Sequence, residues 1–182
     1  MFEISYFHLL IFITASWLTV RGLVALKNRR IDWRRELLLL TVYICLIVIA
    51  RIVYFPMELE NGRIGLLRFD AAKLPGNIQP VPLARLFEKY DGWKINLIGN
   101  IAIFIPVGIC WPLCFKKLNG IFKATAASFG LSLFIELTQL LFYERTSDVN
   151  DLILNTAGAF IGAAIFFAVS SLINKRKKRS EV

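Results

Sequence analysis

The sequence predicts an all-α membrane protein, a bundle of about five transmembrane helices with an extracytoplasmic loop that carries a short amphipathic helix. Two observations predict this class. The 182 residues are 57% hydrophobic and their mean hydropathy is +0.60, values typical of membrane proteins. In addition, about 20 consecutive apolar residues can cross a bilayer as a helix. Five such runs are present, at residues 5–26, 37–55, 96–115, 121–142 and 152–173.

The first run is the most polar of the five. Its diluting residues are Thr14, Ser16, Trp17, Thr19 and Arg21. The leading segment MFEISYF carries an acid and no Lys or Arg, and no small-residue cleavage site follows, so a signal peptide is not indicated. We therefore expect this run to be a retained transmembrane helix. The chain then divides into three parts: a first helix with a basic loop at residues 1–36, a membrane domain at 37–173 and a basic tail at 174–182.

The distribution of Lys and Arg predicts the orientation. Thirteen of them lie in the segments 27–35, 116–123 and 175–179, which fall on one side of the membrane. The other side has seven, of which six lie in the loop 56–94 beside five acids. Basic residues favour the cytoplasmic side, so we expect the N-terminus outside and the C-terminus in the cytoplasm. The net charge of +9 lies mostly beside the spans, and we therefore expect no nucleic-acid partner.

The loop at 56–94 is the only sizeable segment between spans. Pro75, Gly76, Pro80 and Pro82 divide it into turns. The following LARLFEKYDGW has apolar residues at helical spacing, which predicts a short amphipathic helix. This helix could lie along the bilayer surface or pack on the outer mouth of the bundle, and the sequence favours neither arrangement. The apolar positions are Leu83, Leu86, Phe87 and Tyr90.

A polar stripe runs along the fourth apolar run. Its residues are spaced by three or four and are Thr125, Ser128, Ser132, Glu136, Gln139 and Tyr143. At about 100° per residue they share one narrow face of a helix. Lipid would leave the Glu136 carboxylate without a hydrogen-bond partner, so this face is expected to contact protein or water.

The third and fifth runs have polar faces at the matching ends. Asn96, Gly99 and Asn100 share a face of the third run, where Gly99 is expected to admit a neighbouring helix, and Pro106 should kink that run. On the fifth run, Gly158 and Gly162 form a GxxxG seam below a polar start. Thr146 or Ser147 is the expected N-cap of that helix.

In the predicted topology, the polar faces of the third, fourth and fifth runs and Arg51 all lie near the outer side of the membrane. This arrangement indicates a polar pocket that opens to the outer side. The expected ligand-binding residues are Arg51, Asn96, Asn100, Glu136, Gln139, Arg145, Asp148, Asp151 and Asn155. We expect Arg51 and Arg145 to pair with the acids, so that no metal and no cofactor is bound. The competing interpretation is structural, with these groups holding the helices together.

Several of these segments, taken together and in this order, resemble the VanZ-like family of small bacterial membrane proteins. They are NIQP at 77–80, INLIGNIAIFIPVG at 95–108, SLFIELTQ at 132–139, Arg145 and DVNDLILNTAG at 148–158. The resemblance covers roughly residues 37–173. It implies an integral protein of a Gram-positive-type cell envelope, in a family whose founding member is linked to low-level teicoplanin resistance. It implies no established catalytic chemistry.

Three classes of function fit these residues. The leading hypothesis is a non-enzymatic protein that binds an amphiphile: a lipid head group, a lipid-linked wall precursor or a glycopeptide antibiotic. The alternative is a membrane-embedded hydrolase or transferase with Glu136 and Asp148 as catalytic residues. A third class is a small proton-coupled transporter or flippase, for which five spans would require a homo-oligomer.

Overall fold

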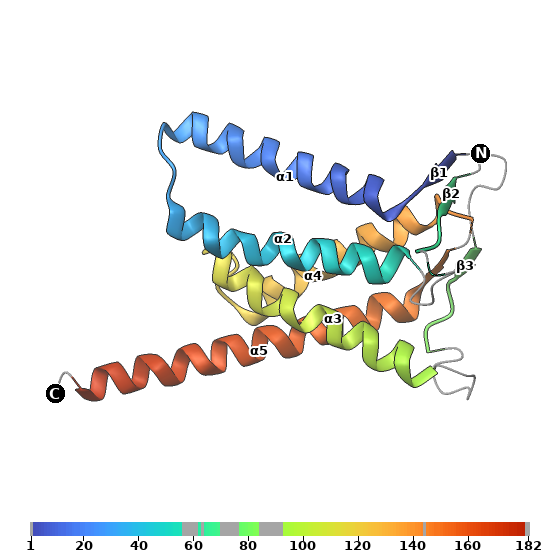
Figure 1. Ribbon diagram of the computed structural model, residues 1–182. Coiled ribbons are helices and arrows are strands. Elements are labelled where there is room, and N and C mark those ends of the chain that lie inside the picture. Colours follow the sequence, from blue (N-terminus) through green and yellow to red (C-terminus); the bar gives the residue numbers. More distant parts are fainter. Residues whose placement is uncertain are drawn as a thin grey trace. The chain divides into compact units, whose positions relative to one another are not determined.

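Five helices dominate the computed structural model, which describes residues 2–55, 62, 64–69, 77–83, 93–143 and 145–180. The helices are α1 (Tyr6–Asn28), α2 (Trp33–Tyr54), α3 (Trp93–Cys114), α4 (Ile121–Gln139) and α5 (Val149–Ser180) (Figure 1). The strands are β1 (Phe2–Ile4), β2 (Leu67–Phe69), β3 (Asn77–Gln79) and β4 (Thr146–Asp148). All five helices are long and apolar enough to cross a membrane, which confirms the predicted all-α membrane class.

Helix ends differ from the ends of the apolar runs. The helix α4 ends at Gln139, so Tyr143 lies beyond it and does not extend the polar stripe. Helix α5 begins at Val149 and continues to Ser180, well past the expected end at residue 173. Backbone hydrogen bonding does not require apolar side chains, so a helix can extend beyond the run that crosses the membrane. The predicted amphipathic helix lies outside the described residues except for Leu83, which has a φ of 62°.

The chain divides into two units. The first unit comprises residues 1–79 and 137–147, and the second comprises residues 80–136 and 148–182. In the first unit, α1 and α2 form an antiparallel hairpin (Figure 1). The Thr14 and Tyr43 hydroxyls lie 2.8 Å apart across it, and the Arg21 guanidinium donates two hydrogen bonds to Glu36. The two helices are therefore joined by polar contacts within apolar sequence.

Short strands complete the first unit. β1 pairs antiparallel with β2 and brings Phe2 opposite Phe69, and β3 pairs with β4. The Tyr6 and Phe55 rings meet edge to face, with centroids 5.6 Å apart. This contact places an aromatic ring from the start of α1 against the residue that follows α2.

The second unit is held together by close contact of α3 with α5, the most extensive helix pair among the described residues. A Cβ atom built on Gly158 would lie 2.1 Å from the carbonyl oxygen of Ile101, and one on Gly162 would lie 2.1 Å from that of Ile105. The predicted GxxxG seam is thus confirmed. The expected contact at Gly99 was wrong, because a Cβ there meets no atom of the described residues within 4 Å.

Gly108 takes the place that we expected for Gly99. A Cβ atom on Gly108 would lie 2.1 Å from the carbonyl oxygen of Ala159. Helix α3 runs without interruption through Pro106 and Pro112. Small residues therefore allow close backbone approach along the middle of α3 rather than at its start.

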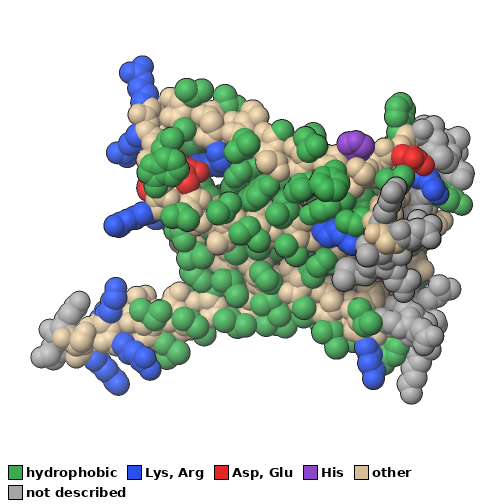
Figure 2. Space-filling view, in the orientation of Figure 1, with side chains coloured by type: hydrophobic (Ala, Val, Ile, Leu, Met, Phe, Trp, Pro, Cys, Tyr) green, Lys and Arg blue, Asp and Glu red, His purple; other side chains and the backbone are tan. Residues whose placement is uncertain are grey.

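Figure 2 shows hydrophobic side chains covering the outward surfaces of the helices in this view. Lys and Arg side chains gather at the turn between α1 and α2 and along the end of α5. Exposed apolar residues on α1 include Ile11, Leu18 and Leu23. A surface of this kind suits contact with lipid tails.

Candidate functional site

Glu136 binds the backbone at the start of α5. Its side chain is 4% exposed, and Oε2 accepts a hydrogen bond of 2.8 Å from the backbone N–H of Asp148. The Asp148 carboxylate in turn accepts a 2.8 Å bond from the backbone N–H of Asn150. The first N–H groups of a helix lack partners within the helix, and carboxylates stabilise that positive end. Two acids from different parts of the chain thus meet at one helix N-terminus.

Asp148 occupies the N-cap position of α5. It directly precedes Val149, the first helical residue, and binds the N–H two residues further on. The expectation of Thr146 or Ser147 at this position was wrong, because both lie further from Val149 than Asp148, whose carboxylate accepts the N–H of Asn150. Pairing of β4 with β3 extends the backbone up to the residue before the helix.

One turn before Glu136 on α4, Ser132 contacts α5. Its Oγ accepts a 3.0 Å hydrogen bond from the side-chain amide of Asn155, which is 2% exposed. The amide oxygen of Asn155 is fully buried and accepts no hydrogen bond from the described residues. A buried acceptor without a partner costs about 1–3 kcal/mol. Asn155 is therefore, like Trp111 with its buried indole N–H, a residue of the second unit with a costly polar atom that is unsatisfied among the described residues.

The first two residues of the α4 stripe, Thr125 and Ser128, satisfy their hydroxyl hydrogen bonds within the helix. The Ser128 hydroxyl donates to the carbonyl of Ala124 at 3.0 Å, and Thr125 donates to the carbonyl of Ile121 at 2.8 Å. Ser128 is as completely buried as Ser132. Thr125 and Ser128 therefore form hydrogen bonds only within α4 among the described contacts. Ser132 and Glu136, further along the helix, form hydrogen bonds to α5 and to the residue before it.

Asn100 links α3 to the start of α5. Its side-chain amide donates to the carboxylate of Asp151 and, at 3.1 Å, to the amide oxygen of Asn96 one turn earlier. Asn96 itself is exposed, whereas Asn100 and Asp151 are half-buried. The predicted polar faces of the third and fifth spans therefore meet.

Sequence reasoning missed Asn150. It is buried, and its side-chain oxygen accepts a 2.6 Å hydrogen bond from the backbone N–H of Leu83. This bond holds the chain where Leu83 adopts its left-handed conformation. The available signal was a further amide between the two aspartates that open the fifth span.

These side chains form a polar cluster around the first two turns of α5. We use this name for Asn100, Ser132, Glu136, Asp148, Asn150, Asp151 and Asn155, all in the second unit. Six of the nine predicted ligand-binding residues lie in this unit. Five of them belong to the polar cluster, and the sixth, Asn96, is hydrogen-bonded to Asn100 of the cluster. Among the described residues, no group of three or more His, Cys, Asp or Glu is arranged to hold a metal ion.

The other three predicted residues lie in the first unit and bind the C-terminal end of α2. Arg145 Nε donates to the carbonyl of Tyr54 at 2.9 Å. Gln139 Nε2 donates to the carbonyl of Val53, and Arg51 Nη1 to that of Phe55, both at 3.3 Å.

The last carbonyls of a helix lack partners within it and form its negative end, which cationic donors stabilise. For Arg51 and Arg145, these contacts provide a structural role. The predicted ion pairs of both arginines with the acids of the polar cluster stay a prediction.

Comparison with known proteins places the chain in a family. The family model described as VanZ/LLP1 matches residues 37–172, well over half of the chain. A stretch of 82 residues, 45% of this chain, is 33% identical to Protein VanZ of Enterococcus faecium and spans 50% of that protein. No solved structure matches the chain. This multi-pass membrane protein belongs to the VanZ/LLP1 family.

Proposed function

We propose that the protein binds the polar head of an amphiphile in its polar cluster, at the extracytoplasmic boundary of the membrane, without catalysing a reaction. The ligand class is a donor-rich head group with an apolar anchor, as in a lipid-linked wall precursor or a lipoglycopeptide such as teicoplanin. Through such binding the protein contributes to glycopeptide resistance or to envelope homeostasis. The family membership supports this role, because the VanZ-like resemblance carries a link to teicoplanin resistance.

The observation that carries the proposal is the buried amide oxygen of Asn155. It accepts no hydrogen bond from the described residues, although it lies in a membrane-spanning helix. Polar groups at such depth are costly unless they have partners, so their presence favours a functional use. A hydroxyl or amide N–H of a ligand is the kind of group that would satisfy this oxygen.

The charges of the polar cluster favour a ligand that donates hydrogen bonds. Glu136, Asp148 and Asp151 supply carboxylates, and ionised carboxylates only accept hydrogen bonds. Ammonium groups and sugar hydroxyls fit this preference. On α5, Ile153 is an exposed apolar neighbour of these residues. A ligand with an acyl chain would therefore find both of the surfaces it needs.

Ser132→Ala tests the proposal. It removes the hydrogen-bond partner of the Asn155 amide, so that the amide is no longer oriented, and should weaken teicoplanin binding by roughly tenfold. The measurement is teicoplanin affinity of the purified protein in neutral detergent, together with teicoplanin susceptibility of a Gram-positive host that expresses it.

Ser128→Ala is the matched control for this substitution. Both serines are completely buried on α4, but Ser128 donates only within its own helix. We expect Ser128→Ala to leave affinity and susceptibility unchanged. Equal losses in the two variants, or full affinity in Ser132→Ala, would count against ligand binding at the polar cluster.

The orientation has its own test, by cysteine labelling in intact cells. Starting from a variant without Cys45, Cys110 and Cys114, a cysteine at position 61 should react with a membrane-impermeant thiol reagent. A cysteine at position 119 should react only after the membrane is opened. The reverse pattern would place the polar cluster on the cytoplasmic side and exclude an extracytoplasmic ligand.

A further inference from the structure

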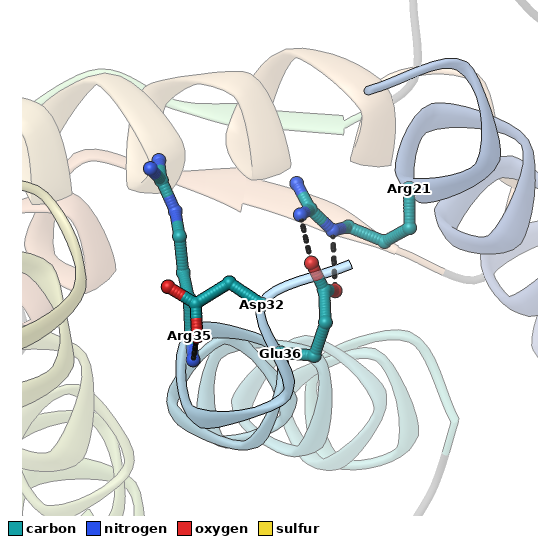
Figure 3. A network of polar contacts seen from close by, with 4 residues as sticks. All are labelled: Arg21, Asp32, Arg35 and Glu36. Atoms are coloured by element: carbon teal, nitrogen blue, oxygen red, sulfur yellow. Dashed lines mark hydrogen bonds and ion pairs between the residues drawn. The ribbon is translucent and has the colours of Figure 1, made fainter. Parts of the chain in front are cut away.

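A polar cavity lies in the first unit, at the turn that joins α1 to α2. Its volume is about 410 Å³. Polar side chains from both helices and from the turn line it, namely Arg21, Asn28, Arg30, Asp32, Arg35 and Glu36. Figure 3 shows four of them, with the Arg21 guanidinium above Glu36 and the Arg35 guanidinium standing apart from that pair. No residue of this cavity belongs to the polar cluster.

Both acids of this cavity already have partners. Glu36 accepts two hydrogen bonds from Arg21, one of them 2.8 Å long. Asp32 is the N-cap of α2, and its carboxylate accepts a 3.2 Å bond from the backbone N–H of Arg35. Among the described residues, neither Arg30 nor Arg35 takes part in an ion pair. Two guanidinium groups at the cavity therefore remain for an external anion.

The position of the cavity indicates which anion. It lies where two membrane-spanning helices meet at their ends, and Val24 and Ala25 of α1 form an apolar part of its wall. Trp33, the first residue of α2, is 72% exposed, and tryptophan is enriched at the boundary between membrane and water. Lipid phosphate groups lie at that boundary, and guanidinium groups bind phosphate with paired hydrogen bonds.

We propose that this cavity binds the phosphodiester of an anionic phospholipid, with Arg30 and Arg35 holding the phosphate oxygens. The Arg21–Glu36 pair fixes the distance between the two helices and so holds the cavity open. The site lies within residues 21–36, outside the region that the VanZ/LLP1 family model matches. The proposed lipid site is therefore separate from the ligand-binding site proposed at the polar cluster.

The experiment follows the melting temperature of the full-length protein in neutral detergent. Phosphatidylglycerol in excess of its dissociation constant should raise the melting temperature by roughly 5 °C. Phosphatidylcholine and inorganic phosphate should each produce little change. A shift of the same size with inorganic phosphate alone would overturn the assignment to a lipid, and so would the absence of any shift with phosphatidylglycerol.

Adjacent arginines provide matched controls. Arg30→Gln and Arg35→Gln should each lose at least half of the shift caused by phosphatidylglycerol. Arg29→Gln and Arg34→Gln remove the same charge from the same exposed segment without lining the cavity, and should keep the shift. Equal losses in all four variants would overturn the proposal in favour of diffuse surface charge.

Native mass spectrometry gives a second measurement for any variant that accumulates poorly. The wild-type protein should retain phosphatidylglycerol, and Arg35→Lys should retain less, since a single ammonium cannot pair with phosphate as a guanidinium does. Retention by Arg35→Lys equal to that of the wild type would contradict the proposed contact. Teicoplanin affinity should be the same in all of these variants.

Discussion

Replacing Gly158 by alanine is expected to lower the melting temperature of the protein by roughly 2–12 °C. The added Cβ would lie 2.1 Å from the carbonyl oxygen of Ile101, far inside the contact distance of the two atoms. The obstructing atom belongs to the backbone of α3, so no side-chain rotation relieves the clash. Overpacking costs about 1–3 kcal/mol or more, and for a chain of this length each kcal/mol corresponds to roughly 2–4 °C.

The effect should extend beyond one contact. Gly108 and Gly162 bring the same two helices equally close, each with a carbonyl oxygen 2.1 Å from the position of a Cβ. When α5 moves away from α3 at Gly158, these neighbouring contacts loosen as well, because packed helices move as rigid elements. The hydrogen bond between Asn100 and Asp151 spans the same pair of helices. We therefore expect Gly158→Ala to weaken ligand binding in addition to stability.

Gly99 and Gly130 provide controls on α3 and α4. A Cβ on either residue meets no atom within 4 Å in the part of the chain that the structure describes, so alanine there should not lower the melting temperature. Alanine is also the better helix former. A thermal-shift series on the three purified variants would measure the contrast, and a Gly158→Ala protein as stable as Gly99→Ala would contradict the close helix contact.

Glu136→Gln is expected to keep the fold and lose the function. Glutamine has nearly the same shape, and its amide oxygen can still accept the N–H of Asp148 that Glu136 Oε2 accepts. What it lacks is the negative charge and the second acceptor. We expect a melting temperature within about 2–4 °C of the wild type, the change that a loss of roughly 1 kcal/mol produces. Teicoplanin affinity should fall by at least tenfold, since a charge-assisted hydrogen bond contributes about 1.5–3 kcal/mol.

Glu136→Leu separates the charge from the hydrogen bond. Leucine has no acceptor, so the backbone N–H of Asp148 would lose the bond that it makes now. A buried donor without a partner costs about 1–3 kcal/mol, and we expect the melting temperature to fall further than in Glu136→Gln. The two variants together show how much of the role of Glu136 is to hold the start of α5.

The outcome that would reverse this interpretation is specific. If Glu136→Gln fails to accumulate in the membrane, or melts as low as Glu136→Leu, the charge itself stabilises the positive end of α5. Glu136 would then be a structural residue, and the ligand-binding proposal would rest on Asn155 and Ser132. A stable Glu136→Gln variant with full teicoplanin affinity would likewise remove Glu136 from the ligand-binding residues.

The sequence by itself determined the class of the protein, its five spans and the faces that carry polar residues. These features follow from local patterns, because lipid penalises every unpaired polar group and so makes runs of apolar residues easy to recognise. The helical period placed Ser132, Glu136 and Gln139 on one face of α4 before any contact was known. The GxxxG pair at Gly158 and Gly162 is a local pattern as well, and it predicted the contact with another helix correctly.

Only the tertiary structure decided which groups bind one another. Arg51 and Arg145 each donate a hydrogen bond to a carbonyl oxygen at the end of α2, a kind of partner that the sequence analysis did not anticipate. Glu136 was expected to pair with an arginine, and the structure adds a partner that side-chain types do not reveal, the backbone N–H of a residue 12 positions away. Side-chain types identify donors and acceptors but not helix ends, where backbone groups compete for the same partners. Which helix end a side chain reaches depends on how the helices pack, and that is set by contacts between segments distant in sequence.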